Sequence, residues 1–323
     1  MTKTFTMPES AGNISRLIDP VTGSTIEGEP VIFYHAKCPD GFAAALAAWI
    51  HFDGRGEYLP ATHDMVVPDV AGKMVYMLDI AFGLETMDRV MAQAQRLVVL
   101  DHHQSTADGL INFHCTCGKV HFDMSKSAAK LAWEAFHPDR PVPELISMVE
   151  DRDLLKWTIK SSSEYLMALD AGPYNFHRWA GILSMPEDAR ERVRSRGRAM
   201  RDMANTMASQ MSEHAATVVI AGEQGLLANA PFMFHNDVGA RLVQRSGTFA
   251  ALWCVESNSS GEPQVRVGLR SNGDFDVIPL AKAFGGGGHE NSSAFRLPIS
   301  RLADLLSGNL ESCSPKLRSS PGR

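Results

Sequence analysis

The chain has few cysteines, no long apolar segment and no excess of basic residues, and each shortage excludes a class of protein. Its five cysteines are an odd number without the spacing of a disulfide framework, which is typical of a reducing compartment. No run of about 18 apolar residues is present, and the first residues lack an apolar secretory core, so neither a membrane span nor a signal peptide is predicted. The formal net charge is −6, so any nucleic-acid contact must come from a local patch or a bound cation. We therefore expect a cytoplasmic protein without a membrane partner.

The length and the order of the sequence patterns predict two domains. The chain has 323 residues, of which 44% are apolar and 21% are charged, as in an ordinary globular protein. Strand-like runs alternate with helical patterns between Val31 and Leu154, which predicts an α/β fold with a doubly wound, mostly parallel sheet. A long helical pattern and a smaller α/β set follow. The expected parts are a flexible arm (1–29), a first domain (30–185), a helical linker (186–216), a second domain (217–307) and a flexible tail (308–323).

Three predicted strands lead into acidic or histidine side chains. These pairs of strand and polar group are Arg96–Leu100 with Asp101, His102 and His103; Val31–Tyr34 with His35 and Asp40; and Met74–Leu78 with Asp79. One such pair alone is most often a helix cap or a satisfied polar group. Three pairs are much less expected by chance, and open α/β sheets place their sites at the carboxyl ends of the strands. The pattern therefore predicts a functional site at this edge of the sheet.

The side chains at the predicted site favour a divalent cation. Aspartate and histidine without thiolates are typical ligands of Mn²⁺, Mg²⁺, Zn²⁺ or Fe²⁺. Asp79 has two oxygens and can bridge two ions, and two ions about 3.5–4 Å apart clamp an in-line displacement at phosphorus. The acidic segment Glu150–Asp153 supplies further candidate ligands, with a surface ion pair as an equally favoured alternative. No nucleophile elbow is present, so acyl chemistry has no support.

A glycine run marks the predicted second domain. Gly285 to Gly288 are followed at once by His289, and bare backbone N–H groups in such a run form an anion-binding concavity. Arg270 ends the predicted strand 264–269 and is of a residue type that pairs with phosphate or carboxylate. We favour phosphate binding over a plain flexible loop.

These motifs together resemble the DHH phosphoesterase superfamily. The resemblance extends from Val31 to Ile299 and rests on the first loop with His35, Asp40 and Gly41, on Asp79, on Asp101-His102-His103, on Asp151-Arg152-Asp153-Leu154 and on the segment Phe284–His289. It implies a parallel α/β domain that holds metal, a helical linker, and a smaller α/β domain that binds substrate, with the site in the cleft. It also implies hydrolysis of phosphodiesters or phosphoanhydrides.

The resemblance assigns roles to individual residues. Catalytic roles fall to Asp79, Asp101, His102 and His103. The implied metal ligands are His35, Asp40, Asp79, Asp101, His102 and Asp151, and the cofactor is Mn²⁺ as one or two ions, with Mg²⁺, Co²⁺ and Zn²⁺ as alternatives. Substrate contacts fall to His103, Arg270, Ser271, Gly286, Gly287, Gly288 and His289. The predicted partner is a short oligonucleotide or a nucleotide, and a homodimer is one open assembly state.

One departure from the family pattern leaves alternatives open. Many members carry a second aspartate two residues after the first one in the initial motif, and this chain has Phe42 there. A second ion would then lack a ligand unless Asp153, Asp101 or water replaces it. We predict a metal-dependent phosphodiesterase for short oligonucleotides or single-stranded nucleic acid. A hydrolase of small phosphoanhydrides or phosphomonoesters, and a catalytically impaired nucleotide-binding module, are the alternatives.

Overall fold

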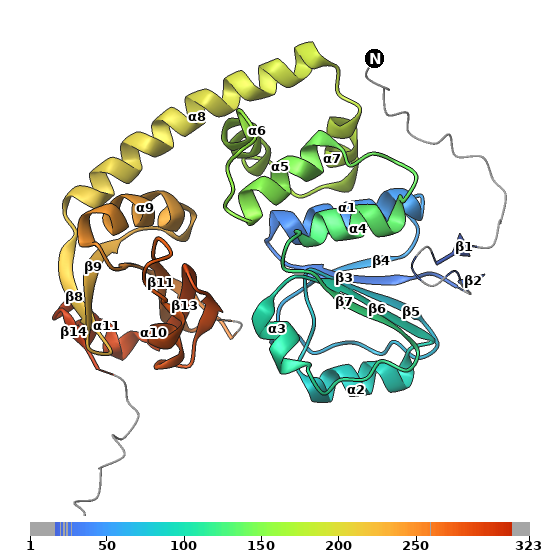
Figure 1. Cartoon of the computed structure of the whole chain (residues 1–323), viewed down its shortest axis with the longest axis horizontal. Helices are drawn as coiled ribbons and strands as arrows, with labels where there is room; N and C mark the ends of the chain where they lie inside the picture. The colour runs from blue at the N-terminus through green and yellow to red at the C-terminus, as the bar shows by residue number, and fades with distance from the viewer. Residues whose placement is uncertain are drawn as a thin grey trace, which may run out of the picture. The chain divides into compact units, whose positions relative to one another are not determined.

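The computed structural model describes residues 17–19, 21, 23, 25, 26, 28–258 and 260–311. The chain divides into two compact units, Met1–Arg201 and Asp202–Arg323, and each is described by itself (Figure 1). The arm and the tail expected at 1–29 and 308–323 lie largely outside the described residues. Their described parts include an antiparallel pair, β1 (Leu17–Ile18) with β2 (Thr25–Ile26), and a short strand, β14 (Asn309–Leu310). No helix in the described ranges combines the length and apolarity needed to cross a bilayer.

The first unit is built on a five-stranded parallel sheet, as the alternation of patterns predicted. Its strand order is β4-β3-β5-β6-β7, and all four neighbouring pairs are parallel. The strands are β3 (Val31–His35), β4 (Glu57–Ala61), β5 (Met74–Leu78), β6 (Arg96–Asp101) and β7 (Gly118–Phe122). From β3 the chain passes to β4 on one side, and the later strands lie on the other side. The strand order therefore reverses between β3 and β5, which is where such sheets bind ligands.

Helices cover both faces of this sheet, and this explains the apolar runs of its strands. Ile32 belongs to the core under one helical layer, whereas Val31 and Phe33 belong to the core on the opposite face. The first layer contains α1 (Pro39–His51), α4 (Ala128–Phe136), α5 (Glu144–Asp153), α6 (Ser162–Asp170) and α7 (Phe176–Leu183). On the opposite face, α2 (Leu84–Gln93) buries Met87 and Val90, and α3 (Gln104–Gly109) connects β6 to β7. Figure 1 shows α1 and α4 on one side of the sheet and α2 on the other.

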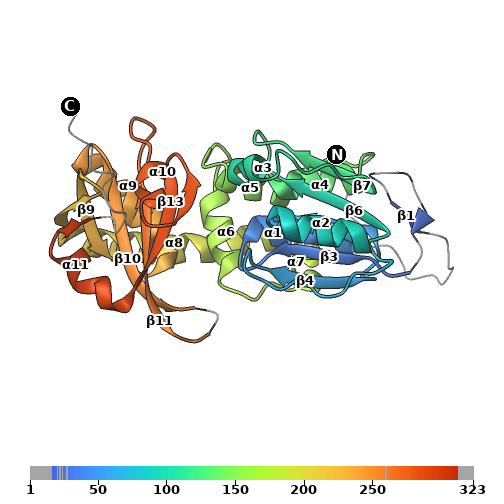
Figure 2. The same cartoon turned by 90° about the horizontal axis from the view of Figure 1, so that it is seen from below.

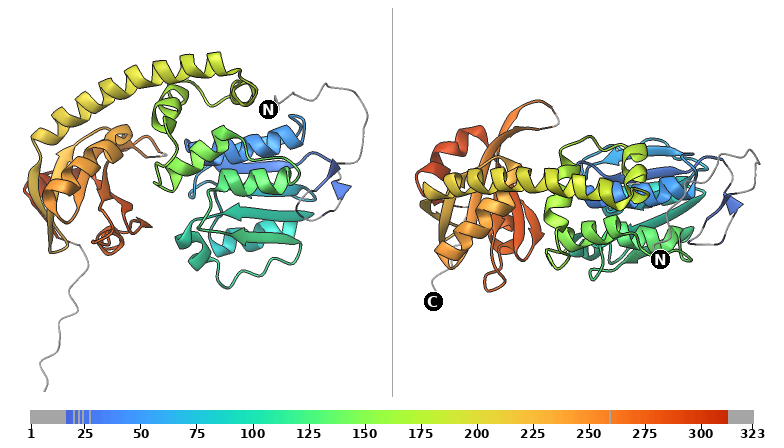
Figure 3. Two further views of the ribbon diagram at one scale, coloured as in Figure 1. Left: turned by 45° about the horizontal axis from the view of Figure 1, so that its top comes forward. Right: turned by 90° about the horizontal axis from the view of Figure 1, so that it is seen from above.

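The long helical pattern predicted at 186–216 forms one continuous helix, α8 (Glu187–Glu213). It is unbroken in both panels of Figure 3. The division between the two units falls within it, between Arg201 and Asp202.

The second unit contains a mixed seven-stranded sheet of order β12-β13-β11-β10-β9-β8-β14, in which the pairs β10–β9 and β14–β8 are parallel. Figure 2 labels β9, β10, β11 and β13 of this sheet. Its other strands are β8 (Ala216–Ile220), β9 (Glu223–Asn229), β10 (Ala250–Ser257), β11 (Pro263–Arg270), β12 (Gly287–His289) and β13 (Ser292–Pro298). α9 (His235–Ser246) packs on β9, β10 and β11. Leu280 of α10 (Ile278–Lys282) and Leu305 of α11 (Leu302–Leu306) belong to the core that holds Val265 and Phe295. Two short 3₁₀ turns are η1 (Phe232–Phe234) and η2 (Ile299–Arg301).

Candidate metal centre

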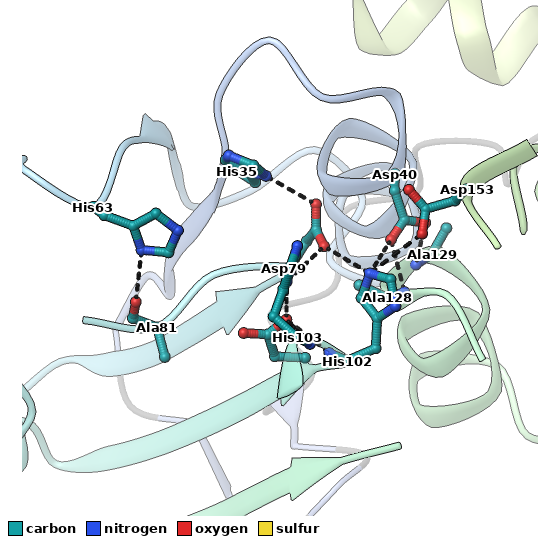
Figure 4. A network of polar contacts seen from close by, with 11 residues as sticks. His35, Asp40, His63, Asp79, Ala81, His102, His103, Ala128, Ala129 and Asp153 are labelled. Carbon is teal, nitrogen blue, oxygen red and sulfur yellow. Dashed lines mark hydrogen bonds and ion pairs between the residues drawn. The ribbon is translucent and has the colours of Figure 1, made fainter. Parts of the chain in front are cut away.

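The predicted strand ends meet at one edge of the first sheet. His35 is the last residue of β3, Asp79 directly follows β5, and Asp101 ends β6 and is followed by His102 and His103. Because β3, β5 and β6 are neighbouring parallel strands, their carboxyl ends lie side by side. Figure 4 shows the side chains of His35, Asp79, His102 and His103 gathered at these ends.

Four of these side chains, together with Asp40 and Asp153, form two groups with the composition of a metal site. The first group is His35, Asp79 and His103, and the second is Asp40, His102 and Asp153. Within each group the potential ligand atoms lie within 4.8 Å of one another. Asp79 contacts both groups, because its Oδ2 is 3.4 Å from His35 Nδ1 and its Oδ1 is 3.4 Å from His102 Nε2. The two groups therefore adjoin at the carboxylate that the sequence suggested as a bridge.

The second group is centred on His102. Its Nε2 lies 3.3 Å from Asp153 Oδ2 and 3.6 Å from Asp40 Oδ2. Asp40 stands in the first turn of α1, and its carboxylate also accepts hydrogen bonds from the first two N–H groups of α4, those of Ala128 (2.8 Å) and Ala129 (3.0 Å). A helix N-terminus favours a negative charge. Asp40 is therefore held rigidly between two helices while it faces His102.

Asp101 fixes the two histidines that follow it. It is fully buried, and its Oδ1 accepts hydrogen bonds from the backbone N–H of His102 (2.7 Å) and of His103 (3.2 Å). The same oxygen lies 2.7 Å from His103 Nδ1, which therefore carries the donated proton. Asp101 lies in neither of the two groups, so its contacts are those of a residue that orients His102 and His103.

The acidic segment contributes Asp153 to the cluster in place of Asp151. Both oxygens of Asp151 are occupied, Oδ1 by Thr158 through its N–H and its hydroxyl (each 2.7 Å), and Oδ2 by Ile159 N–H and Ser162 Oγ (each 3.1 Å). Side chains two residues apart on a helix of 3.6 residues per turn point to opposite sides. Asp151 thus anchors the loop after α5, whereas Asp153 faces His102, and the structure favours Asp153 over Asp151 as a candidate ligand.

Phe42 does not leave a gap in the site, because it points into the core. It is 2% exposed and stacks on Phe176 (centroids 4.6 Å apart) and on Tyr174 (5.2 Å), with Trp179 edge-on at 5.0 Å. Asp153 supplies a third carboxylate to the cluster. Phe42 thus belongs to the core, and the carboxylate beside Asp40 and His102 comes from Asp153 at the end of α5.

Two backbone features place the ligands. Asp79 has a φ of +62°, a left-handed conformation that is uncommon for a residue with a side chain, and its N–H donates to Leu100 O at 3.0 Å. Gly41 packs tightly on the end of β3, because a Cβ at this position would lie 2.7 Å from the carbonyl oxygen of His35. The glycine allows α1, which carries Asp40, to approach the strand that carries His35.

The buried charges perturb one another strongly. Burial and the neighbouring Asp79 raise the pKa of Asp153, and burial with Asp79 and Asp153 raises the pKa of Asp40 well above its usual value. Burial opposes ionisation of Asp79 too, but the imidazoles of His102 and His35 hold its pKa well below the usual range. Burial alone would lower the pKa of His102, yet Asp79 and Asp153 raise it to about 9. The cluster therefore attracts positive charge.

The residues fit one or two divalent cations. Both oxygens of Asp79, Nδ1 of His35 and Oδ2 of Asp153 are buried and have no hydrogen-bond partner among the described residues. Buried polar atoms normally have such partners, so atoms that converge without one are suited to an ion. Carboxylate and imidazole ligands match Mn²⁺, Mg²⁺, Zn²⁺ and Co²⁺.

One further histidine beside the cluster had no signal in the sequence. His63 follows β4, and its ring lies 5.9 Å from that of His35, with Nδ1 3.3 Å from Ala81 O. The strand before it is short, partly exposed and contains Pro60, which is typical of an edge strand and weakens any strand pattern. The sequence therefore does not indicate that His63 follows a strand of the sheet.

The second unit holds the predicted substrate residues near one end of β11. Arg270 ends β11, and its guanidinium donates to Asn236 Oδ1 and to Leu269 O, each at 2.8 Å. Burial and the neighbouring Arg266 lower the pKa of Arg270 to about 10. Ser271 Oγ lies 3.0 Å from Asn291 Oδ1.

Part of the glycine run forms an exposed strand at the edge of the second sheet. Gly287, Gly288 and His289 form β12, which pairs with β13, and Gly286 precedes it. A Cβ at Gly288, whose φ is +140°, would lie 2.5 Å from Ser292 O, so the strand approaches its neighbour too closely for a side chain there.

Comparison with known proteins defines the fold. No known protein-family model matches this chain. A solved DHH-domain structure, from a protein described as a member of a family of ribosomal proteins, superposes with a TM-score of 0.55 over 87% of this chain and 85% of its own, at 13% identity. The chain has the DHH-domain fold. That result confirms the fold implied by the sequence resemblance.

Other similar proteins are more distant in structure or have no described activity. The pGpG-specific phosphodiesterase PggH of Vibrio cholerae gives a TM-score of 0.47 at 14% identity, over 86% of this chain and 96% of its own. RecJ of Thermus thermophilus, solved in complex with Mn²⁺, gives 0.48 at 13% identity, and the match spans 87% of this chain and 51% of RecJ. In sequence, the uncharacterized protein R106 of Acanthamoeba polyphaga mimivirus is 26% identical over 300 residues, which covers 86% of this chain and 70% of R106.

Proposed function

We propose that this chain is a cytoplasmic, Mn²⁺-dependent phosphodiesterase that hydrolyses short oligonucleotides or single-stranded nucleic acid. The observation that carries the proposal is the convergence of three carboxylates, those of Asp40 and Asp79 buried and that of Asp153 half-buried, and three imidazoles at the point where the strand order of the sheet reverses. Such a mixed set, with several atoms that lack a hydrogen-bond partner among the described residues, is costly to bury without a cation.

The proposed ligands divide between two positions. His35, Asp79 and His103 would hold one ion, and Asp40, His102 and Asp153 a second, with Asp79 in contact with both groups. When bound, such ions polarise a phosphoryl oxygen and lower the pKa of water, so that it attacks phosphorus without a covalent intermediate.

The protein's own contribution is to fix these groups before the substrate arrives. Asp101 holds the His103 ring through Nδ1, so the ring presents a constant face to the site. Asp40 is immobilised by two backbone N–H groups of α4. Fixed donors and charges of this kind stabilise the charge that develops in the transition state without reorganisation. With Nδ1 held by Asp101, His103 has only Nε2 left for the first ion, so the contact to the scissile phosphate that the resemblance implied for His103 is not proposed beside this ligand role.

The substrate end is proposed to lie on the second unit. Arg270 has no carboxylate partner within 4.0 Å among the described residues, and Arg266 lies near enough to lower its pKa. Arg266 is itself paired with Glu256 at 3.7 Å, so the charge proposed to attract an anion is that of Arg270, and Arg is suited to bidentate phosphate contacts. Ser271, Gly286, Gly287, Gly288 and His289 complete the proposed set.

A panel of substrates tests the proposal. The full chain is incubated in the presence of Mn²⁺ with each of three substrates in turn: an end-labelled pentaribonucleotide, pyrophosphate and phosphoadenosine phosphate. We expect the wild-type chain to cleave the pentanucleotide. The Asp79→Asn variant should lose both this cleavage and the binding of Mn²⁺. Hydrolysis of only the small phosphoanhydride or the phosphomonoester would establish the alternative activity. Tight nucleotide binding without turnover of any substrate would refute hydrolysis altogether.

A further inference from the structure

His63 lies beside the metal cluster and is not part of the DHH motifs. It stands two residues after β4, the edge strand that pairs in parallel with β3. The carbonyl of Ala61, the last residue of β4, accepts a hydrogen bond from Ala36, which directly follows His35. The carboxyl end of β4 is thereby fixed against the loop that begins at His35. Figure 4 shows the His63 ring on the same edge of the sheet as His35 and Asp79.

The His63 ring is held with a defined tautomer. Its Nδ1 lies 3.3 Å from the carbonyl oxygen of Ala81, which can only accept, so Nδ1 carries the proton and Nε2 carries the lone pair. No hydrogen bond to Nε2 is found within the described ranges. Ala81 lies two residues after Asp79, so the ring is anchored to the segment that supplies the central carboxylate. A histidine that ligates a metal usually donates its other ring N–H to a backbone carbonyl or carboxylate in this way.

The His63 ring lies as close to the His35 ring as the His103 ring does, although His63 belongs to neither candidate group. The His63 and His35 ring centroids are 5.9 Å apart, and the His35 and His103 centroids, which belong to one candidate group, are 6.0 Å apart. His63 is exposed, whereas Asp79 is buried, so His63 approaches His35 from the solvent side.

We propose that His63, through Nε2, is an additional ligand of the cation held by His35, Asp79 and His103. The inference rests on the proposed metal site and extends it to a fourth strand end. It assigns a specific role to β4, which contributes none of the six grouped residues. His63 would be the most exposed of the side chains that hold this cation.

The test is a titration of the full chain with Co²⁺ alone, followed by calorimetry, absorption spectroscopy and proton NMR. The variant is His63→Gln, whose side-chain amide can still donate to Ala81 O, so a purely structural role is preserved. The control is His114→Gln, because His114 is exposed and lies before the amino end of β7, at the opposite end of the sheet.

We expect His63→Gln to weaken Co²⁺ binding by at least about tenfold, since loss of merely an outer-shell partner costs about 10–100-fold. The variant should also lose one exchangeable, hyperfine-shifted imidazole N–H signal and change the visible spectrum, whereas His114→Gln should match the wild type. An unchanged Co²⁺ affinity and spectrum in His63→Gln would overturn this inference and leave the metal site intact. Failure of the wild type itself to bind Co²⁺ would overturn the metal site together with the inference.

Discussion

The contrast between Asp151 and Asp153 provides the sharpest test of the site. Asp151 is 3% exposed, and its carboxylate accepts four hydrogen bonds from Thr158, Ile159 and Ser162. Asp151→Asn replaces one of the two oxygens by an NH₂ group. The hydroxyls can rotate away from it, but the opposing backbone N–H, of Thr158 or of Ile159, cannot, so at least one part-buried donor loses its acceptor.

The size of the effect follows from these contacts. An unmet buried donor costs about 1–3 kcal/mol, and hydrogen bonds to a charged group contribute about 1.5–3 kcal/mol each. We therefore expect Asp151→Asn to lower the free energy of unfolding by about 3 kcal/mol. For a unit of about 200 residues that corresponds to a Tm lower by roughly 6–12 °C. Its Mn²⁺ affinity should be close to that of the wild type.

Asp153→Asn should show the opposite behaviour. Its Oδ2 is buried without a hydrogen-bond partner among the described residues and faces His102 at 3.3 Å. We expect a change in metal-free stability of no more than about 1 kcal/mol, and a Mn²⁺ affinity lower by at least about tenfold. Calorimetric titration with Mn²⁺ and thermal melting of both metal-free variants provide the readouts. A stable Asp151→Asn variant that fails to bind Mn²⁺, beside an Asp153→Asn variant that binds normally, would refute the reasoning.

Three further predictions concern the core and the buried histidines. Phe42→Asp should lower the free energy of unfolding, measured by chemical denaturation, by more than about 4 kcal/mol, because it buries a charge in an aromatic stack. The soluble fraction of this variant should bind no more Mn²⁺ than the Phe42→Leu variant does. Gly41→Ala should weaken Mn²⁺ binding by about tenfold with unchanged helix content by circular dichroism, since its Cβ would press on the His35 carbonyl. His137 and His235 have pKa values lowered to about 4, mainly by burial, so the unfolded chain takes up protons first as the pH falls below 6.5. Stability should then be lost between pH 6.5 and 4, by at most about 3 kcal/mol per imidazole, and denaturant melts of His137→Gln and His235→Gln should show a shallower loss.

The sheet and most of its site could be predicted from the sequence because strands buried on both faces have a strong signature. β3, β5 and β6 are short apolar runs, and parallel strands bring their carboxyl ends together whatever the intervening loops do. Convergence of His35, Asp79 and His102 therefore needed only the parallel order, which the alternation of patterns predicted. The domain boundaries and the ligand roles remain predictions.

What the sequence did not predict depended on contacts that are not local. Whether Asp151 or Asp153 faces the cluster is decided by the phase of α5 and by the loop around Thr158, which captures Asp151. β4 escaped notice because Pro60 and an exposed face leave it without a clear pattern. Residues 57–61 form a strand because they pair with β3, and such pairing cannot be predicted from the residues of one segment alone.

The same contacts explain how the fold tolerates three acidic groups at one point. Each carboxylate has its own compensation: two helical N–H groups for Asp40, two imidazoles for Asp79, and His102 for Asp153. That compensation is incomplete, because the pKa values of Asp40 and Asp153 are raised while that of Asp79 is held low. A site optimised only for stability would have replaced one of these acids by an apolar residue, since buried ion pairs seldom stabilise more than packed hydrocarbon. The fold therefore retains an electrostatic cost that a divalent cation would relieve, and this cost is concentrated where the strand ends converge.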